Sequence, residues 1–255
     1  MGTEEAGPLL AALIRFARPQ RVLEVGMGYT TPLLAAALAD VRDEAAEEAS
    51  ALVRKTRSHL ADGSLDEAWL LADPPLVDPA YHLVERVPHL VAVDDLSIAE
   101  SSADRVAAVL REWGLDELVT VVDSDVRRAR ERLPVGFAPI DLAWVDAWEC
   151  LYFFDHFWDL INPAGGLVVF HYLVGYPEGE AVLRYLKRWQ QTHHDTVEVM
   201  NLVEPHKMAQ NSLTVLRRTT GTAGGERTHE GGEVVFTESL HAAARSLRDR
   251  LPIAD

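Results

Sequence analysis

The segment from Arg21 to Thr31 constrains the fold of this chain more than any other part of the sequence. It begins as an apolar strand pattern at residues 22–25 and runs into a turn with glycine at positions 26 and 28. Glycine lets the backbone turn tightly and approach a ligand closely, and the amide groups of the helix that follows point back at the turn. The segment therefore predicts a cradle for a nucleotide cofactor, although a two-glycine turn can also serve only as a tight connection.

Strands and helices alternate along the chain. The spacing of apolar residues predicts strands at 22–25, 90–93, 119–122, 141–145 and 167–170, and helices at 9–17, 31–39, 98–113, 127–132 and 151–160. A helix at 181–191 and two closing strands at 196–202 and 212–217 follow. This alternation predicts an α/β fold with a doubly wound, Rossmann-like sheet that is mostly parallel.

A long insertion interrupts this plan. Asp94 lies 68 positions after Gly26, whereas the ribose-binding acid of a dinucleotide unit follows its glycines after about 20 residues. We therefore expect an inserted segment at about residues 41–88. Its predicted elements are a charged helix at 43–60, a shorter helix at 65–71 and a proline-rich loop at 73–79. A lid over the cofactor cleft and a dimerisation arm are both open interpretations of the insertion.

The predicted catalytic domain extends over residues 1–218 and includes the insertion. Residues 219–232 are rich in glycine, threonine and charge, which predicts a flexible linker. Residues 233–255 then predict a strand and an amphipathic helix that dock on this protomer or on its neighbour. A homodimer is therefore one expected form of the protein.

Composition narrows the class of protein. A chain of 255 residues with 48% hydrophobic content can bury one sizeable core, so we expect a single catalytic domain. The net charge of −16 repels phosphate backbones and anionic lipid surfaces, which argues against nucleic acid or membrane partners. With one cysteine, no signal-peptide pattern and no apolar run of transmembrane length, we expect a cytoplasmic protein. That cysteine, Cys150, adjoins an apolar run and is predicted to be a packed thiol rather than a nucleophile.

The identity of the cofactor depends on position 31. The dinucleotide fingerprint requires a third glycine there, and this chain has Thr31. Instead, Glu24-x-Gly26-x-Gly28 resembles the first motif of class I S-adenosylmethionine (SAM) methyltransferases. Later motifs of that family are matched, in order, by Asp94, Ser124-Asp125, Asp141 to Asp146, and Pro163 to Phe170. The resemblance covers about residues 9–218 apart from the insertion, and it implies SAM as the cofactor and an antiparallel hairpin as the end of the sheet.

The resemblance also implies which residues surround SAM. Glu24 is expected near the cationic methionine part, Asp94 at the ribose hydroxyls with Asp95 as the second choice, and Asp125 at the adenine amine. Helix capping remains an alternative for Asp94, Asp95 and Asp125, and more so for Asp95 than for Asp94. The complete expected cofactor set is Glu24, Gly26, Met27, Gly28, Tyr29, Thr30, Thr31, Asp94, Asp95, Ser124, Asp125 and Asp146.

Two residues at strand ends are the expected catalytic groups. Some small-molecule O-methyltransferases use the acid at the position of Asp146 as a magnesium ligand, together with a second acid and an Asp-Asn pair after the next strand. Here that strand ends in Phe170-His171-Tyr172, so the ligand set is incomplete and we predict no metal. His171 is predicted to be a general base, and a structural histidine is the alternative. Asp146 is predicted to bind the methionine amine, to orient the acceptor or to act as a base.

The acceptor site is expected beside these residues. Trp148 and Tyr172 are predicted to wall it, and a polar loop at residues 204–212 is predicted to bind an anionic group of the acceptor through His206 and Lys207. Gln210 and Asn211 would supply hydrogen bonds there, whereas a solvated loop is the alternative.

The sequence therefore predicts an O- or N-methyltransferase that acts on a small, anionic metabolite, in the setting of natural-product biosynthesis. Transfer of another SAM carbon, as in aminocarboxypropyl transfer or cyclisation, is a second interpretation. A non-catalytic SAM- or nucleotide-binding module is a third, and a nicotinamide dehydrogenase ranks last because of Thr31.

Overall fold

The chain folds into two compact units. The computed structural model describes residues 2–97, 101–193, 196–220, 227–230 and 233–250. The first unit comprises residues 1–41 and 88–221, and the second comprises residues 42–87 and 222–255. The inserted segment and the C-terminal tail therefore belong to one unit, and the elements expected for the catalytic domain belong to the other.

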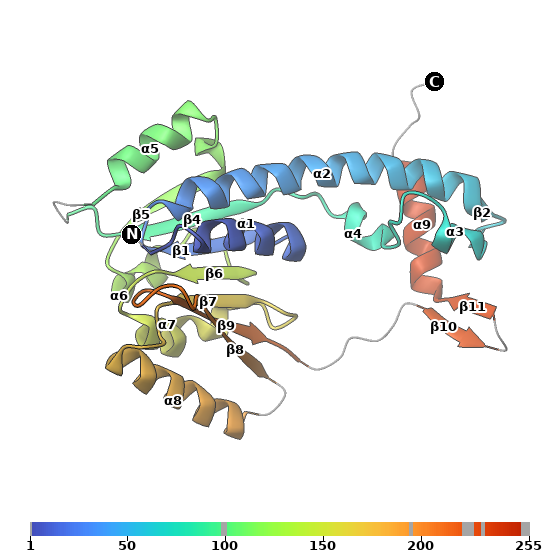
Figure 1. Ribbon diagram of the computed structural model, residues 1–255. Helices are drawn as coiled ribbons and strands as arrows, with labels where there is room; N and C mark the ends of the chain where they lie inside the picture. The colour runs from blue at the N-terminus through green and yellow to red at the C-terminus, as the bar shows by residue number, and fades with distance from the viewer. Residues whose placement is uncertain (1, 98–100, 194–195, 221–226, 231–232, 251–255) are drawn as a thin grey trace. The chain divides into compact units, whose positions relative to one another are not determined.

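The first unit is built on a seven-stranded sheet with the order β5-β4-β1-β6-β7-β9-β8 (Figure 1). Its strands are β1 (Arg21–Val25), β4 (His89–Asp94), β5 (Val119–Asp123), β6 (Leu142–Val145), β7 (Leu167–His171), β8 (Val197–Val203) and β9 (Ser212–Arg218). Strands β5, β4, β1, β6 and β7 are parallel, and β9 runs antiparallel to both β7 and β8. The predicted fold class, a mostly parallel sheet with a closing antiparallel hairpin, is confirmed.

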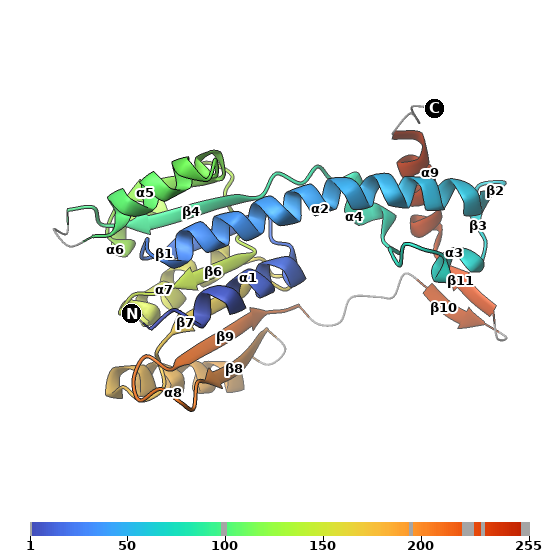
Figure 2. The same ribbon diagram turned by 45° about the horizontal axis from the view of Figure 1, so that its top comes forward.

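Helices cover both faces of this sheet (Figure 2). They are α1 (Ala6–Ala17), the first part of α2 (Thr30–His59), α5 (Ala103–Glu112), α6 (Val126–Ala129), α7 (Cys150–Phe157) and α8 (Pro177–Thr192), with 3-10 turns η1 (Asp116–Leu118), η2 (Arg130–Arg132) and η3 (Trp158–Leu160). Successive residues of a strand face opposite sides of a sheet. Accordingly, Leu23 packs in one buried cluster with Phe153 of α7, and Val22 packs in the other with Leu34 of α2.

The register of the parallel strands aligns their carboxyl ends. Val25 of β1 pairs with Val93 of β4 and Val145 of β6, and Val145 pairs with Phe170 of β7. The residue that follows each of these positions is Gly26, Asp94, Asp146 or His171. The sheet therefore brings four sequence-distant predicted site residues to one edge, where α/β proteins bind their ligands.

Helix α2 is longer than the sequence predicts. We expected one helix at 31–39 and a separate one at 43–60, but the structure has a single helix from Thr30 to His59. No glycine or proline occurs between Leu33 and Asp62 to end it. Although α2 is long, it carries many charged residues, and among the described residues no helix is both long and apolar enough to span a membrane.

The predicted helix at 65–71 is only partly correct. Residues 60–65 form a hairpin of β2 (Leu60–Ala61) and β3 (Ser64–Leu65), and only α3 (Ala68–Leu71) is helical. Asp62 and Gly63 connect the two strands with φ values of 50° and 82°. This is an Asp-Gly signal for a two-residue hairpin loop, which the helical spacing obscured.

The second unit has a hydrophobic core of its own. Its other elements are α4 (Pro79–Leu83), β10 (Arg227–Glu230), β11 (Glu233–Phe236) and α9 (Glu238–Arg250). Trp69 from the insertion is fully buried and meets Phe236 of the tail edge to face, with ring centroids 5.8 Å apart. Leu52, Leu240 and Leu247 complete the centre of the cluster. The tail, expected to dock on this protomer or on its neighbour, thus packs on the insertion of its own chain.

Two sequence expectations fall partly outside the described residues. Strand β10 lies within the range 219–232 predicted to be a linker, while residues 221–226 and 231–232 are not described. Similarly, the helix expected from residue 98 is seen from Ala103 onward as α5, and residues 98–100 are not described.

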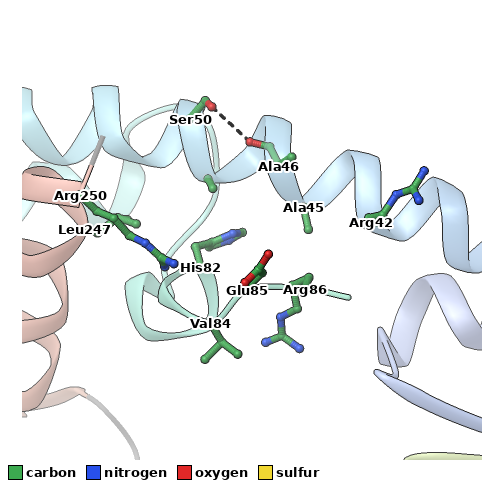
Figure 3. A pocket seen from close by; sticks show the side chains of 11 residues that line it. Arg42, Ala45, Ala46, Ser50, His82, Val84, Glu85, Arg86, Leu247 and Arg250 are labelled. Carbon is green, nitrogen blue, oxygen red and sulfur yellow. Dashed lines mark hydrogen bonds between the residues drawn. The ribbon is translucent and has the colours of Figure 1, made fainter. Parts of the chain in front are cut away.

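The second unit also contains a pocket of about 560 Å³ (Figure 3). Ala45, Ala46 and Ala49 of α2 form one wall, and the segment that follows α4 forms another. His82 and Glu85 also line the pocket. Arg250 of α9 donates a hydrogen bond to the Leu83 carbonyl. Arg42, Arg86 and Arg250 outnumber the single carboxylate, so the lining of the pocket carries a net positive charge.

We predict that Trp69 stabilises the second unit. Trp69→Ala removes a fully buried ring and leaves a cavity, so it should lower the free energy of unfolding by about 3–5 kcal/mol. Leu71→Ala, in the same helix but at a side chain that is 88% exposed, should change it by less than about 0.5 kcal/mol. Urea unfolding followed by circular dichroism measures both. Equal effects of the two variants would contradict the assignment of Trp69 to a packed core.

Candidate active site

The two glycines of the turn after β1 differ in the space around them. Gly26 has a φ of 94°, and a Cβ atom there would lie 2.8 Å from the Asp146 carbonyl oxygen. A Cβ atom at Gly28 would meet only the Ser102 hydroxyl, at 3.9 Å. Gly26 is therefore required by the fold, whereas Gly28 leaves space beside the turn for a ligand.

The residues around this turn differ in exposure. Met27, Thr30 and Thr31 are buried, and the Tyr29 side chain is 60% exposed. Thr31 Oγ1 accepts a hydrogen bond from the Gly28 amide at 3.0 Å. A buried threonine thus occupies the position where a dinucleotide-binding turn needs its third glycine.

Glu24 is fully buried at the end of β1. Its Oε1 accepts a hydrogen bond from the Thr30 hydroxyl at 2.6 Å, and that hydroxyl accepts one from Trp144 Nε1 at 3.2 Å. Its Oε2 has no hydrogen-bond partner within the described residues. Burial raises the pKa of the Glu24 carboxyl to about 8, against the smaller opposing effect of the Thr30 and Thr31 hydroxyls. The folded protein therefore holds a proton on Glu24 at neutral pH.

Asp94 closes the turn from the neighbouring strand. Its Oδ2 accepts a hydrogen bond from the Met27 amide at 2.9 Å, and its Oδ1 accepts one from the Ser101 hydroxyl at 3.1 Å. Asp95, the second choice for the ribose, instead accepts both the amide and the hydroxyl of Ser97, at 3.1 and 2.6 Å. These bonds lower the pKa of the Asp95 carboxyl. Asp94 thus contacts the glycine turn directly, and Asp95 is engaged in its own loop.

Ser124 and Asp125 follow β5. The Ser124 amide donates to the Asp94 carbonyl at 2.9 Å, which places this segment beside the end of β4. Asp125 caps α6, because its Oδ1 accepts the Arg127 amide at 2.7 Å. The capping alternative for Asp125 is thus observed, and its role toward adenine remains a prediction.

Asp146 and His171 form a hydrogen-bonded pair at the ends of β6 and β7. The distance between Asp146 Oδ1 and His171 Nδ1 is 2.8 Å. The His171 side chain is 4% exposed and that of Asp146 is 28% exposed. A carboxylate that accepts from Nδ1 leaves Nε2 as the ring nitrogen able to take a proton. In the described part of the chain, Nε2 has no hydrogen-bond partner.

Three aromatic rings stand beside this pair. Trp148 lies 5.0 Å from Tyr172 and 5.8 Å from Tyr176, measured between ring centroids. Trp148 is 66% exposed, and Tyr172 has a φ of 44°, an uncommon backbone conformation for a bulky residue. Burial and the charge of Asp146 raise the pKa of the Tyr172 hydroxyl, so it stays protonated. Trp148 is therefore exposed enough to contact a ligand, and its role at the acceptor stays a prediction.

Cys150 is not part of this arrangement. It is buried, and its thiol donates to the Ala147 carbonyl at 3.1 Å. Burial raises the pKa of the thiol to about 12, which keeps it in the unreactive protonated form. The prediction of a packed thiol is confirmed.

Ion pairs within the loop between β8 and β9, and one to Glu4, engage its charged residues. Lys207 Nζ lies 2.7 Å from Glu204 Oε2 and 3.6 Å from Glu4 Oε2. His206 Nε2 lies 3.8 Å from the same Glu204 oxygen. Asn211 donates to the Lys207 carbonyl at 2.9 Å, and the Gln210 side chain packs against Gly2. The structure thus pairs Lys207, the predicted anion-binding residue, with two carboxylates.

A pocket of about 220 Å³ lies between this loop, β7 and the start of α1. Of the predicted residues, His171 and Asn211 line it. Sequence reasoning missed Glu5, Ala6, Leu9 and Glu204 as pocket residues, because the sequence pattern does not say where α1 packs. Its full lining is Glu5, Ala6, Leu9, His171, Leu202, Val203, Glu204, Asn211, Ser212 and Leu213.

A metal site was also considered for the described part of the chain. Within the described ranges, no group of three or more histidine, cysteine, aspartate or glutamate side chains is arranged to hold a metal ion. The prediction that the protein uses no metal stays a prediction.

Comparison with known proteins identifies the fold. No protein-family model matches the chain, and no curated protein sequence is similar to it. Among solved structures, it is similar to the O-methyltransferase TomG from Streptomyces achromogenes, involved in tomaymycin synthesis and solved with SAM. The TM-score is 0.56 and the identity 20%, over 84% of this chain and 80% of that one.

Two further solved methyltransferase structures are also similar to this chain. For an O-methyltransferase from Bacillus cereus in complex with S-adenosylhomocysteine (SAH), the TM-score is 0.54 at 14% identity, over 84% of this chain and 81% of that one. For the SAH-bound methyltransferase PaMTH1 from Podospora anserina, the TM-score is 0.51 at 14% identity, over 84% of this chain and 77% of that one. The chain therefore has the fold of class I SAM-dependent methyltransferases.

We predict that Glu24 makes stability depend on pH. Between about pH 4.5 and pH 8 the folded protein keeps a proton on Glu24 that the unfolded chain releases, so the free energy of unfolding falls as pH rises through this window. Glu24→Gln removes this effect and should be more stable than the wild type by an amount that grows, up to the order of a few kcal/mol, from pH 5 to pH 8.5. Urea unfolding at several pH values measures the difference.

Glu112→Gln is the control, because Glu112 is an exposed residue near the end of α5. It should parallel the wild type at each pH. A constant difference between Glu24→Gln and the wild type across this range would show that Glu24 is already ionised in the folded protein.

Proposed function

We propose that the protein is a SAM-dependent methyltransferase that methylates an oxygen or nitrogen atom of a small molecule, with His171 as the general base. The observation that carries this proposal is the 2.8 Å bond between Asp146 and His171 at the ligand-binding edge of a methyltransferase-type sheet. The three similar structures are methyltransferases crystallised with SAM or SAH, which supports SAM as the cofactor.

The residues at this edge fit SAM. Gly28 leaves space beside the turn, and the Asp94 carboxylate suits the ribose hydroxyls because an ionised carboxylate only accepts hydrogen bonds. The buried Glu24 Oε2 lacks a partner among the described residues. A cation bound beside it would favour the ionised carboxylate, so binding of the cationic end of the cofactor would release the proton that Glu24 holds in the free protein. Ser124 and Asp125, which follow β5 beside the end of β4, are the proposed contacts of the adenine.

When bound, SAM supplies the methyl group from its sulfonium and leaves as SAH. His171 Nε2 takes the proton that the acceptor atom loses as its bond to the methyl carbon forms. Asp146 holds the imidazole in the required tautomer and stabilises its positive charge after proton transfer. Trp148 and Tyr172 do not line the pocket of about 220 Å³ beside His171 but a separate small hollow. Their rings adjoin the Asp146–His171 pair, and from there they would exclude water from the reacting atoms.

The nature and setting of the acceptor follow from composition and similarity. The net charge of −16 argues against a nucleic acid acceptor, and the similarity to TomG supports a small-molecule one. TomG acts in tomaymycin synthesis, which supports a role in natural-product biosynthesis. We keep the cytoplasm as the proposed location, since the single buried cysteine suits a reducing compartment.

We predict that Gly28→Ala weakens SAM binding without unfolding the protein. Its methyl group fits the empty turn, so stability should change by less than about 1 kcal/mol, but it fills the space proposed for the ligand and should raise the Kd of SAM and SAH at least about tenfold. Calorimetric titration and thermal unfolding measure the two effects. By contrast, Gly26→Ala places Cβ against the Asp146 carbonyl at a positive φ and should itself lower stability, by about 1–3 kcal/mol. Unchanged SAM affinity in Gly28→Ala would place the cofactor elsewhere.

We also predict that His171→Ala lowers kcat by about 100-fold or more, because the proton acceptor is lost. The Kd of SAM should stay within about twofold of the wild-type value. Added imidazole should restore part of the activity, an effect that a purely structural histidine would not show. SAH formation with a panel of hydroxyl- and amine-bearing small molecules measures the rate.

Three controls accompany this test. Asp146→Asn should reduce kcat with SAM binding unchanged if Asp146 acts through His171, whereas a raised Kd would show that it contacts the cofactor. Treatment with EDTA should leave the activity unchanged if no metal takes part. Detection of methylthioadenosine instead of SAH would identify transfer of another carbon and overturn methyl transfer.

A further inference from the structure

The pocket beside His171 has an unusual charge for a site expected to bind an anion. Glu5 and Glu204 line it together with His171. Glu4 precedes Glu5 in the chain and is paired with Lys207, which also pairs with Glu204. Ala6, Leu9, Leu202, Val203 and Leu213 form the apolar part of the lining. The pocket thus combines an apolar wall with carboxylates.

The carboxylates outnumber the cations that face them. Among the described side chains, Lys207 is the one ammonium group that pairs with these carboxylates, and it is shared between Glu204 at 2.7 Å and Glu4 at 3.6 Å. The positive charge of the chain's amino terminus also acts on Glu4. Glu5 has no ion-pair partner among the residues that the structure describes. His206 adds a positive charge at 3.8 Å from Glu204 only when its exposed ring is protonated. Near neutral pH the pocket is therefore electronegative.

Two other features do not reverse this sign. The N-terminus of α1 borders the pocket and contributes about half a positive charge, which is less than the charge of Glu4 and Glu5 directly before the helix. Asp146 adds a further negative charge behind His171, to which it is hydrogen-bonded. A bound carboxylate or phosphate would therefore be repelled by several groups and attracted by a lysine that is already paired.

The buried imidazole indicates that this pocket receives a ligand. His171 is 97% buried, lines the pocket, and has a ring nitrogen with no partner within the described residues. A buried histidine that lines a partly apolar pocket and keeps one ring nitrogen unpaired within the described residues is typical of a binding site.

We infer that this pocket binds the acceptor and selects one that carries a protonated amino group next to an apolar body. Glu5 and Glu204 bind the ammonium group, and the apolar wall covers the body. The inference rests on the proposed function, because it assigns the acceptor class of the same site. It replaces the anionic acceptor that the sequence predicts from Lys207.

Three probes of similar size test which charge the pocket prefers in a ligand: 2-phenylethylamine, 3-phenylpropanoate and 2-phenylethanol. Their binding is measured on the protein without cofactor. We expect the amine to bind at least about tenfold more tightly than the carboxylate at low salt, with the alcohol between them. The advantage of the amine should shrink at 0.5 M NaCl, because salt screens exposed charges. Calorimetry and ligand-observed NMR measure the affinities.

Lys207→Gln distinguishes the two interpretations of the loop. If the pocket binds ammonium, this variant should bind 2-phenylethylamine as well as or better than the wild type, because it frees the two carboxylates. If Lys207 binds an anion, the variant should lose affinity for 3-phenylpropanoate. Glu5→Gln and Glu204→Gln should each weaken amine binding about threefold to tenfold. Glu198→Gln is the matched control, since Glu198 pairs with Arg217 on β9 and does not line the pocket.

Preference for the carboxylate probe, or unchanged amine affinity in both glutamate variants, would overturn the inference. Thermal unfolding of each variant shows whether a loss of binding reflects a loss of folding. SAM binding and SAH formation are measured in parallel. If SAM binds and only neutral or anionic acceptors are methylated, the charge inference fails and the proposed function stands. If the amine binds in the pocket but SAM does not bind, the proposed function fails instead.

Discussion

The parallel register of four neighbouring strands is the constraint on which the candidate site depends. Because β1, β4, β6 and β7 end at paired positions, the residues that follow them meet at one edge although they are distant in sequence. Backbone hydrogen bonds fix this alignment beyond the strands: the Gly26 amide donates to the Val93 carbonyl and the Asp146 amide to the Val25 carbonyl. The close approach of Gly26 to Asp146 ties the glycine turn to the same edge.

Around that edge, two carboxyl groups lie in different environments. Glu24 is sealed beneath the turn and is protonated at neutral pH, since few groups near it stabilise a charge. Asp146 is partly exposed and hydrogen-bonded to His171, so it can act on the imidazole next to the pocket. Burial therefore separates a carboxyl that suits cofactor binding from one that suits proton transfer.

The inserted segment and the tail show how a long insertion can be stabilised. Neither has enough apolar surface to form a core alone, but Trp69 and Leu52 from one and Phe236 and Leu240 from the other bury one another. The unit thereby gains a core separate from the two clusters that flank the large sheet. This explains why the insertion and the tail, which are far apart in sequence, belong together.

The sequence by itself determined the order of strands and helices, the fold class and the positions at which polar residues follow the parallel strands. These depend on local periodicity and on chain order, which are written in neighbouring residues. The tertiary structure alone decided that Asp146 bonds to His171, that Glu24 is buried rather than exposed at the turn, and that Lys207 is paired with Glu4 and Glu204. It also decided that the tail completes the core of the insertion and that the start of α1 lines a pocket with His171. Each of these depends on which distant side chains share a space and on how much water remains between them, and the spacing of residues along a chain does not specify either.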